Sequence, residues 1–273
     1  MYSRFLLLFF LLAAVQPLTF GRQSKAADRL IVSGLVLLND KTPLHTKPLF
    51  DALGAEWQIK ADSISEKEET VVFLVGDVLV MLARQDYALP PNDIAAAAQI
   101  SWLWKNAETE AARHQSHLIV SVIGKPSDAL SLHKLFTKIA ACMLENTNSV
   151  GIYLPNQYLL LSKGYYLESA KNMSSAVLPL YLWVYFGLLQ DNGRSSGYTY
   201  GLKEFGLEEM EVVNSTHNLQ EVHAFLYDAA QEIVLSGKHL KEGDQVGTKE
   251  DGKVSVTISK CTFLDDMSVK LDF

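Results

Sequence analysis

The sequence predicts an α+β fold, with antiparallel or mixed sheets and packed helices arranged as two lobes. Short apolar runs rich in β-branched residues, typical of strands, are interspersed with amphipathic segments of helical period. The 273 residues are 48% hydrophobic, which is enough for the core of one large domain or two small ones. Because no Pro-, Gly- or Ser-rich linker separates the halves, we expect lobes 30–125 and 126–273 to pack tightly together.

The first lobe contains four predicted strands and two predicted helices. In chain order they are strand 30–38, helix 47–57, strands 70–75 and 78–85, a helix capped by Asn92 or Asp93, and strand 116–124. The two-residue joint Gly76-Asp77 favours a tight hairpin, because glycine adopts positive φ without steric cost. The charged run "SEKEET" at 65–70 is typical of a solvated loop. The resulting order, β-α-β-β-α-β, is that of a ferredoxin-like unit.

The second lobe opens with a predicted helix at 126–144, for which Ser127 or Asp128 is a candidate cap. Two short strands follow in "VGIYLP" and "QYLLLS". The run "LPLYLWVYFGLLQ" at 178–190 is apolar throughout but is too short for a membrane span, so we expect a central strand buried on both faces. An amphipathic helix at 218–237 and two half-exposed strands in "KVSVTISKC" and "SVKLDF" complete the lobe.

The stretch "GYTYGLKEFGLEEMEVV" at 197–213 is the main candidate site. Its period-two pattern predicts two strands joined by a turn at "EFGLE". Gly201 interrupts the first strand, which indicates a bulge or the close approach of a backbone or ligand. Thr199, Glu209 and Glu211 then form a polar set on one sheet face, and with Gly201 they are the candidate ligand-binding residues. The alternative is a plain hairpin, in which both glutamates face water and the aromatic side chains pack the core.

Two histidines are the candidates for metal binding. "ARHQSHLIV" places His114 and His117 three residues apart, so both rings lie on one face if a helix continues through them. Together with Glu209 and Glu211 they could bind a divalent ion or take part in acid–base catalysis. The alternative is a helix-to-strand joint in which both rings hydrogen-bond to the backbone.

Composition and motifs exclude several classes of protein. The formal net charge is −7 and no basic face is evident, so we expect no nucleic-acid partner. Nucleophile-elbow, phosphate-loop and dinucleotide-binding motifs are absent. Cys142 and Cys261 fit neither a disulfide framework nor a zinc site. These patterns indicate no particular cofactor.

The N-terminus has the features of an export signal. Arg4 precedes an apolar run at 5–15, and a polar, helix-breaking exit follows. We expect a signal peptide at 1–21, a linker at 22–29, and an exported (periplasmic or secreted) mature chain without a transmembrane domain. The alternative is an extension that does not act as a signal, which would leave the protein in the cytoplasm.

The chain also resembles a known family. The stretch 197–213 is similar to the signature of a bacterial family of domains of unknown function, number forty-two sixty-one. Supporting segments, in the same order, are "VVFLVGDVLVMLARQDYALPPND", "WKNAETEAARHQSHLIVSVIG", "LPLYLWVYF" and the ending "VKLDF". The similarity extends over residues 32–273, which implies an intact but uncharacterised family member and transfers no activity. Most similar proteins begin close to the first strand, so the resemblance implies that the leader is an addition or a start-site artefact.

Two functions from different classes fit these observations. The first is a non-enzymatic binding or interaction protein with a groove beside residues 197–211 for a protein or a small ligand. It rests on the absence of catalytic motifs and the abundance of aromatic residues in predicted strands. The second is a metal-dependent hydrolase that uses His114, His117, Glu209 and Glu211. We prefer the first because it requires fewer assumptions.

Overall fold

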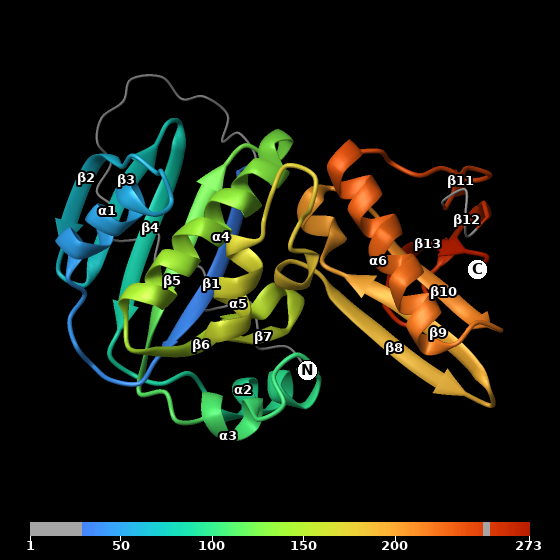
Figure 1. Ribbon diagram of the computed structural model, residues 1–273, viewed down its shortest axis with the longest axis horizontal. Helices are drawn as coiled ribbons and strands as arrows, with labels where there is room; N and C mark the ends of the chain where they lie inside the picture. The colour runs from blue at the N-terminus through green and yellow to red at the C-terminus, as the bar shows by residue number, and fades with distance from the viewer. Residues whose placement is uncertain (1–28, 248–251) are drawn as a thin grey trace.

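The computed structural model describes residues 29–247 and 252–273, which form an α+β fold of two sheets with packed helices (Figure 1). The predicted fold class is therefore confirmed. The predicted signal peptide at 1–21 and all but the last residue of the predicted linker at 22–29 lie outside the described residues. None of the helices in the described ranges combines the length and apolar character that crossing a membrane requires.

The first sheet has seven strands in the order β2-β3-β4-β5-β1-β6-β7, each antiparallel to its neighbours. The strands are β1 (Leu30–Leu38), β2 (Asp62–Lys67), β3 (Thr70–Val75), β4 (Val78–Gln85), β5 (Ser116–Gly124), β6 (Ser149–Leu154) and β7 (Leu159–Ser162). The helices packed on this sheet are α1 (Thr46–Ala55), α2 (Pro91–Gln99), α3 (Ala107–Ala111), α4 (Ala129–Asn146) and α5 (Lys163–Lys171).

Helices cover both faces of the first sheet. In β1, Val36 and Leu38 join the main core with α1, α4 and α5, whereas Leu37 joins a smaller core with α2 and α3. This division follows from the alternation of side chains along a strand. Both faces are apolar for that reason, and the strands β1, β3, β4 and β5 have the ranges that their apolar runs predicted. The predicted hairpin at Gly76 is also confirmed, with φ of 57°.

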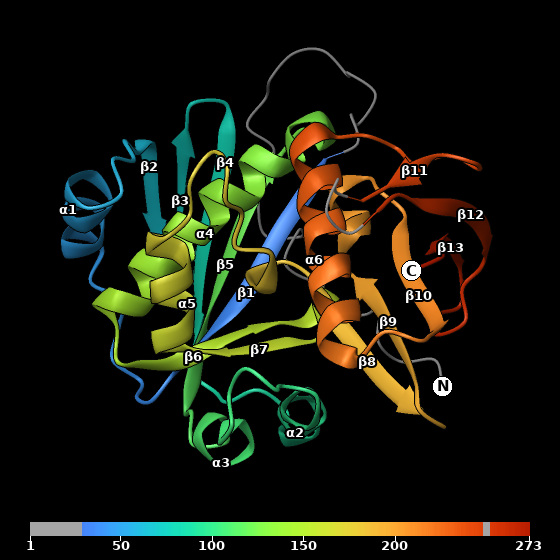
Figure 2. The same cartoon turned by 45° about the vertical axis from the view of Figure 1, so that its right-hand side comes forward.

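The second sheet has six strands in the order β11-β12-β13-β10-β9-β8. They are β8 (Tyr185–Asp191), β9 (Arg194–Tyr200), β10 (Glu209–Ser215), β11 (Gln245–Val246), β12 (Val254–Lys260) and β13 (Met267–Leu271). Only β10 and β13 pair in parallel among these described strands. Helix α6 (Leu219–Ser236) crosses one face of β8, β9 and β10 (Figure 2).

The ferredoxin-like detail of the prediction is not confirmed. The charged run predicted as a loop contributes to β2, so three strands instead of two separate α1 from α2. All residues of β2 are exposed, and the strand pairs with β3 at the margin of the sheet. Backbone pairing alone forms this strand, and so no hydrophobic pattern could reveal it.

The two sheets divide later in the chain than the predicted lobes. Strand β6 pairs with β1 and β7 pairs with β6, so residues 30–162 supply the first sheet and 185–271 the second. The predicted boundary between 125 and 126 therefore lies within the segment that builds the first sheet. Local patterns specify that a strand exists but not which strand it joins, which explains the difference.

The apolar run at 178–190 does not form one central strand. Its first part is a 3-10 turn, Leu180–Leu182, and only Tyr185–Asp191 is a strand, at the edge of the second sheet. Pro179 has no N–H to donate to a ladder, and its carbonyl instead accepts from the Leu182 N–H at 2.8 Å. The central-strand prediction was therefore wrong.

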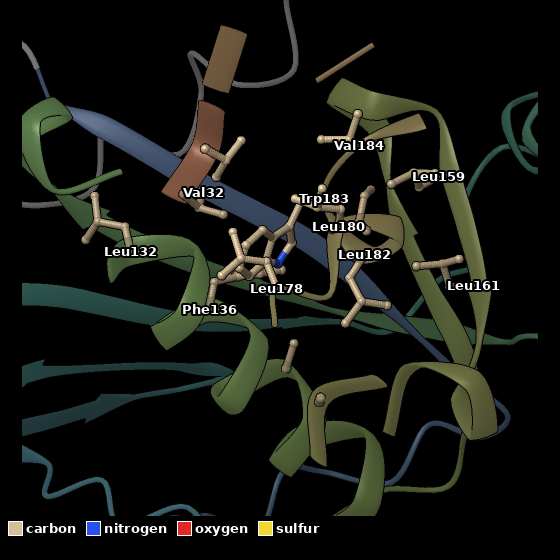
Figure 3. Packing of buried hydrophobic residues seen from close by; sticks show 14 of the residues in the cluster. Val32, Leu132, Phe136, Leu159, Leu161, Leu178, Leu180, Leu182, Trp183 and Val184 are labelled. Atoms are coloured by element: carbon tan, nitrogen blue, oxygen red, sulfur yellow. The ribbon is translucent and has the colours of Figure 1, made fainter. Parts of the chain in front are cut away.

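The residues that precede β8 are apolar because they pack between the two sheets. Leu178, Leu180, Leu182 and Trp183 are buried beside α4 and β7 (Figure 3). The indole Nε1 of Trp183 donates to Oγ1 of Thr137 on α4 at 2.8 Å, so the one polar atom of this ring has a partner. Such burial joins the sheets into a single core, as expected from the absence of a linker.

Candidate functional site

The stretch 197–213 forms the predicted strand–turn–strand unit. Strands β9 and β10 pair antiparallel, with Glu211 opposite Tyr198. A short 3-10 helix, Leu202–Phe205, fills the turn, and Gly206 ends it with φ of 72°. The hairpin prediction is confirmed, including the glycine that takes the left-handed conformation.

Gly201 lies where this hairpin meets the segment between the sheets. Its φ is 133°, and a Cβ at this position would lie 2.7 Å from the carbonyl oxygen of Trp183 and 3.2 Å from the Cα of Val184. The close approach predicted at Gly201 is therefore that of another backbone segment. Glycine is required here both for its conformation and for its lack of a side chain.

Glu209 is a buried acceptor that organises the turn. Its Oε1 accepts from the backbone N–H of Gly201 at 2.8 Å and of Lys203 at 3.3 Å. Its Oε2 accepts from the Thr199 hydroxyl at 2.8 Å, and that hydroxyl oxygen accepts from the Met210 N–H at 2.8 Å. Glu209 and Thr199 are 3% and 0% exposed, so this carboxylate is fully occupied inside the protein.

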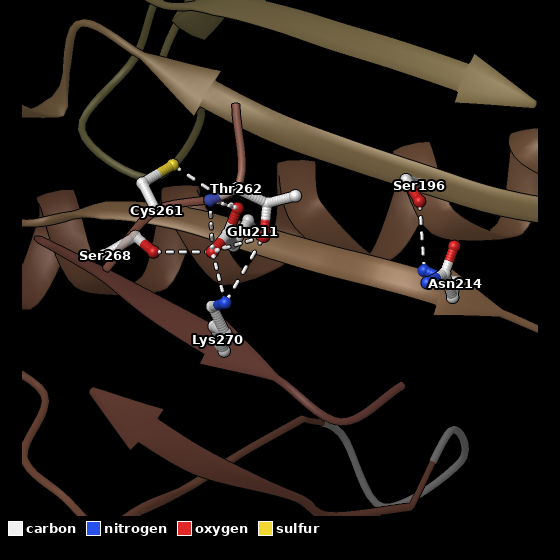
Figure 4. A network of polar contacts seen from close by, with 7 residues as sticks. All are labelled: Ser196, Glu211, Asn214, Cys261, Thr262, Ser268 and Lys270. Atoms are coloured by element: carbon white, nitrogen blue, oxygen red, sulfur yellow. Dashed lines mark hydrogen bonds and ion pairs between the residues drawn. The ribbon is translucent and has the colours of Figure 1, made fainter. Parts of the chain in front are cut away.

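Glu211 binds the loop between β12 and β13 (Figure 4). Its oxygens accept from the Ser268 hydroxyl at 2.8 Å, the Thr262 N–H at 2.9 Å and the Cys261 thiol at 3.3 Å, and Lys270 Nζ lies 3.3 Å away. Burial by itself raises the pKa of the Glu211 carboxyl, but these donors together hold it below its usual value. Glu211 is therefore an ionised acceptor that holds the 261–266 loop and β13 against β10.

The faces of the hairpin differ from the predicted arrangement. Glu211 lies opposite Tyr198 and shares its face, whereas Thr199 is the next residue along β9. Both glutamates are buried instead of facing water, and Tyr198 and Tyr200 are half-buried instead of packing the core. The cause is the position of β10, which lies inside the sheet between β13 and β9, with the 261–266 loop bound to Glu211.

His114 and His117 hydrogen-bond to the backbone at the joint between α3 and β5. His114 Nδ1 lies 2.7 Å from the Ala111 carbonyl oxygen, and its Nε2 accepts from the Leu89 N–H at 2.8 Å. His117 Nδ1 lies 2.9 Å from the Tyr87 carbonyl oxygen. Burial lowers the pKa of both rings and favours their neutral form. This is the arrangement of the alternative interpretation, a joint held by ring-to-backbone hydrogen bonds.

The structure does not assemble the candidate metal ligands into one site. His117 lies in β5 of the first sheet, whereas Glu209 and Glu211 lie in β10 of the second and already bind protein donors. Across residues 29–247 and 252–273, no group of three or more His, Cys, Asp or Glu side chains is arranged to hold a metal ion. A hydrolase that uses these four residues would lack its ligand cluster in the described part of the chain.

The comparisons with known proteins agree with the resemblance noted in the sequence, over a shorter segment. Residues 198–272 match a family model described as Domain of unknown function (DUF4261). No curated protein and no solved structure matched the chain.

Beside this matched segment lies an aromatic surface that the sequence pattern did not predict. The ring of Tyr198 stacks on that of Phe263, with centroids 5.2 Å apart and an angle of 19° between the planes. Tyr185 contacts Tyr198 edge-on at 6.2 Å, and Tyr200 contacts Tyr158, which lies between β6 and β7, at 5.9 Å. We call these five side chains the aromatic face: Tyr158, Tyr185, Tyr198, Tyr200 and Phe263.

The aromatic face lies on the side of the second sheet away from α6. A Cβ at Gly197 would lie 2.7 Å from Leu226 of α6, so position 197 faces the helix and Tyr198, the next residue, faces away. The period-two tyrosines at 198 and 200 were a signal for this face. Phe263 and Tyr158 join the DUF4261 hairpin only through tertiary packing, and no local pattern marks them.

Proposed function

We propose that this protein is a non-enzymatic binding protein that contacts a protein partner through the aromatic face beside residues 197–211. The observation that carries the proposal is the set of five aromatic side chains on the face that α6 leaves uncovered. Their rings contact one another in two groups, Tyr158–Tyr200 and Tyr185–Tyr198–Phe263. None of the five is fully buried, and Tyr158 is 39% exposed. Part of each ring is therefore accessible for contact with a partner.

The chemistry of the face favours a protein partner. Tyrosine presents a large apolar ring with a polar tip, and it is enriched at the centres of protein interfaces. The negative net charge of −7 opposes stacking of nucleic-acid bases on these rings, since the phosphates would be repelled. Two cavities of about 460 and 410 Å³ lie elsewhere, one beside α6 and Phe273 and the other beside α1 and Ile64.

The candidate residues predicted from the sequence, Glu211, Glu209 and Gly201, hold the segments that carry the aromatic face. Glu211 holds the loop that carries Phe263, so that Phe263 reaches Tyr198. Glu209 and Gly201 fix the turn that follows Tyr200. In this proposal they position the aromatic face and do not touch the partner, because their side chains or backbone are buried.

Photo-crosslinking in cells of the source organism tests the proposal. Benzoylphenylalanine replaces Phe263 in one variant and Ile64 in the control, where Ile64 is 46% exposed on β2 of the other sheet. We expect a discrete adduct with another protein at position 263 and none at position 64. Adding Tyr198→Ala should lower the adduct yield several-fold, whereas Tyr87→Ala, at a 53% exposed aromatic residue of the first sheet, should not.

Two outcomes would count against this function. One is the absence of any protein adduct at position 263 in a variant that folds. The other is the same set of adducts at positions 263 and 64, since this would mean that the cross-linker reports crowding and not a specific face.

A further inference from the structure

The outer strand β8 is an unprotected sheet edge. Natural proteins block edge pairing with short strands, charged residues, bulges or a cover, because unpaired backbone groups otherwise attract another strand. Strand β8 has seven residues, Tyr185–Asp191, without lysine, arginine or proline. Leu188 and Leu189, near its middle, are 37% and 44% exposed. An edge strand with this sequence can pair with a further strand.

The other edges of the two sheets carry the protection that β8 lacks. Strand β2 has the charged sequence DSISEK and a register shift between Asp62 and Ser65. Strand β11 has only two residues. Strand β7 has four residues, Leu159–Ser162, of which the first three are buried. Among the described edge strands, β8 is therefore the least protected against pairing with another strand.

The hairpin geometry shows which backbone groups of β8 are free. Asn192 and Gly193 form a two-residue turn with φ of 48° and 76°, and Asp191 lies opposite Arg194. In such a hairpin the closing pair exchanges both backbone hydrogen bonds, and bonded pairs then alternate along the ladder. The N–H and C=O groups of Phe186, Leu188 and Gln190 consequently point away from β9; Phe186 is buried, whereas Leu188 and Gln190 lie in the exposed half of the strand.

We propose that β8 pairs antiparallel with β8 of a second copy of this chain, about a two-fold axis at Leu188. An isologous contact needs one surface that complements itself. Pairing centred on Leu188 sets this residue against its own copy and sets Leu189 against Gly187. The single charged residue of the strand, Asp191, then lies opposite Tyr185 and does not meet its copy. Like charges are therefore kept apart and the two exposed leucines become buried.

The pairing joins the two second sheets and their aromatic faces. Positions 185, 187 and 189 lie on the same side as Tyr198, because Gly187 is opposite Tyr198 and a side chain at Gly187 would overlap that ring. Residues directly opposite in an antiparallel ladder point to the same face. Tyr185 and Leu189 of both copies thus line the junction, and the two aromatic faces become one continuous surface.

Sedimentation velocity of the full chain measures the oligomeric state. We expect the mass of two chains at micromolar concentration, and a shift to one chain for Leu188→Lys, which places two like charges at the axis. Ile64→Lys, at the protected β2 edge, should remain a dimer. A wild-type chain that stays monomeric at tens of micromolar, or a Leu188→Lys variant that stays dimeric, would overturn the proposal.

A cysteine at position 188, on the proposed two-fold axis, tests the register of the β8–β8 pairing with a substitution that does not add a charge. Leu188→Cys should form a disulfide between chains upon mild oxidation, because directly paired residues have Cα atoms about 5.5 Å apart, within disulfide range. Leu235→Cys on α6 is the matched control, since Leu235 is 38% exposed, and it should not cross-link. The native Cys142 and Cys261 are buried and do not compete. Equal cross-linking of both variants would contradict the proposed axis.

Discussion

At the scale of single residues, the buried glutamates show how acidic side chains serve the fold of this protein. Glu211 is an unexposed carboxylate that accepts from a backbone N–H, a hydroxyl and a thiol and lies beside an ammonium group. Hydrogen bonds to a charged acceptor are stronger than neutral ones, and removing the acceptor leaves its donors unpaired. The sequence indicated Glu211 as a candidate site residue, and in the structure its hydrogen bonds are made to other parts of the protein.

We expect Glu211→Gln to lower the free energy of unfolding at pH 7 by about 2 kcal/mol, because an amide cannot accept as many of these donors. The carboxyl pKa is held below its usual 4.5 in the folded protein. Its stabilisation is therefore fully present above pH 4.5 and is lost as the pH falls through the lower folded pKa. Urea unfolding should show the largest difference from wild type near pH 7 and a smaller one near pH 3.

The exposed neighbour Glu208 provides the control for this measurement. Glu208→Gln should change the free energy of unfolding by less than about 0.5 kcal/mol at either pH, as is usual for surface substitutions. A Glu211→Gln effect that does not diminish in acid would show that the ionised carboxylate is not what stabilises the loop.

At the scale of elements, helix α6 begins with a complete capping box. The Asn218 side chain accepts from the Glu221 N–H at 3.0 Å, and Glu221 accepts from the Asn218 N–H at 2.9 Å. Asn218→Ala should lower the free energy of unfolding by about 1 kcal/mol, since an N-terminal N–H group loses its acceptor. Thermal unfolding followed by circular dichroism measures this effect.

The N-terminus of α4 supplies a matched comparison. Asp128 occupies the cap position there, as the sequence allowed, but its side chain makes no capping hydrogen bond. Asp128→Ala should therefore cost less than Asn218→Ala, leaving only its favourable charge near the helix dipole, worth about 0.5 kcal/mol. Equal losses at the two positions would mean that the capping bonds contribute little.

Elements were predictable where one local pattern decided them. The apolar runs of β1, β3, β4 and β5 and the glycine hairpin at Gly76 needed no tertiary information. The charged β2 failed because pairing with β3, not burial, makes it a strand. The run 178–190 failed because interior packing between sheets produces the same apolar composition as a central strand.

The candidate site was predictable in part for the same reason. Gly201 and Gly206 have the conformations that the hairpin pattern required. The surroundings of Glu211 depend on β13 and on the 261–266 loop, which reach it from fifty or more residues away in the chain. Alternation along one hairpin could not show that a distant loop covers those carboxylates, nor that Phe263 would stack on Tyr198.

At the scale of the whole molecule, the two sheets are joined through a buried histidine. His133 of α4 stacks on Phe205 of the hairpin turn with ring centroids 4.2 Å apart, and it contacts Trp183 at 5.7 Å. Its Nδ1 lies 2.9 Å from the Ala129 carbonyl oxygen, while its buried Nε2 has no hydrogen-bond partner among residues 29–247 and 252–273. The junction thus contains a neutral ring, and the described part of the chain offers no hydrogen-bond acceptor that would stabilise a positive charge at Nε2.

Acid should therefore weaken the junction before it affects most carboxylates. Burial lowers the pKa of His133 from 6.5 to about 4, so the unfolded chain binds a proton over this range that the folded protein does not. The contribution of the neutral His133 ring to stability is fully present above pH 6.5. It falls by about 3 kcal/mol as the pH approaches 4, at about 1.4 kcal/mol for each pKa unit.

The variant His133→Phe keeps the ring stack, so its free energy of unfolding at pH 8 should lie within about 1 kcal/mol of the wild-type value. Between pH 7 and 4.5 this variant should lose less stability than wild type. His239→Gln, at an exposed histidine, should retain the wild-type decline. Urea titrations at several pH values measure these slopes. A His133→Phe slope equal to that of wild type would place the acid sensitivity at the other buried histidines, His114 and His117, or at the half-buried His223.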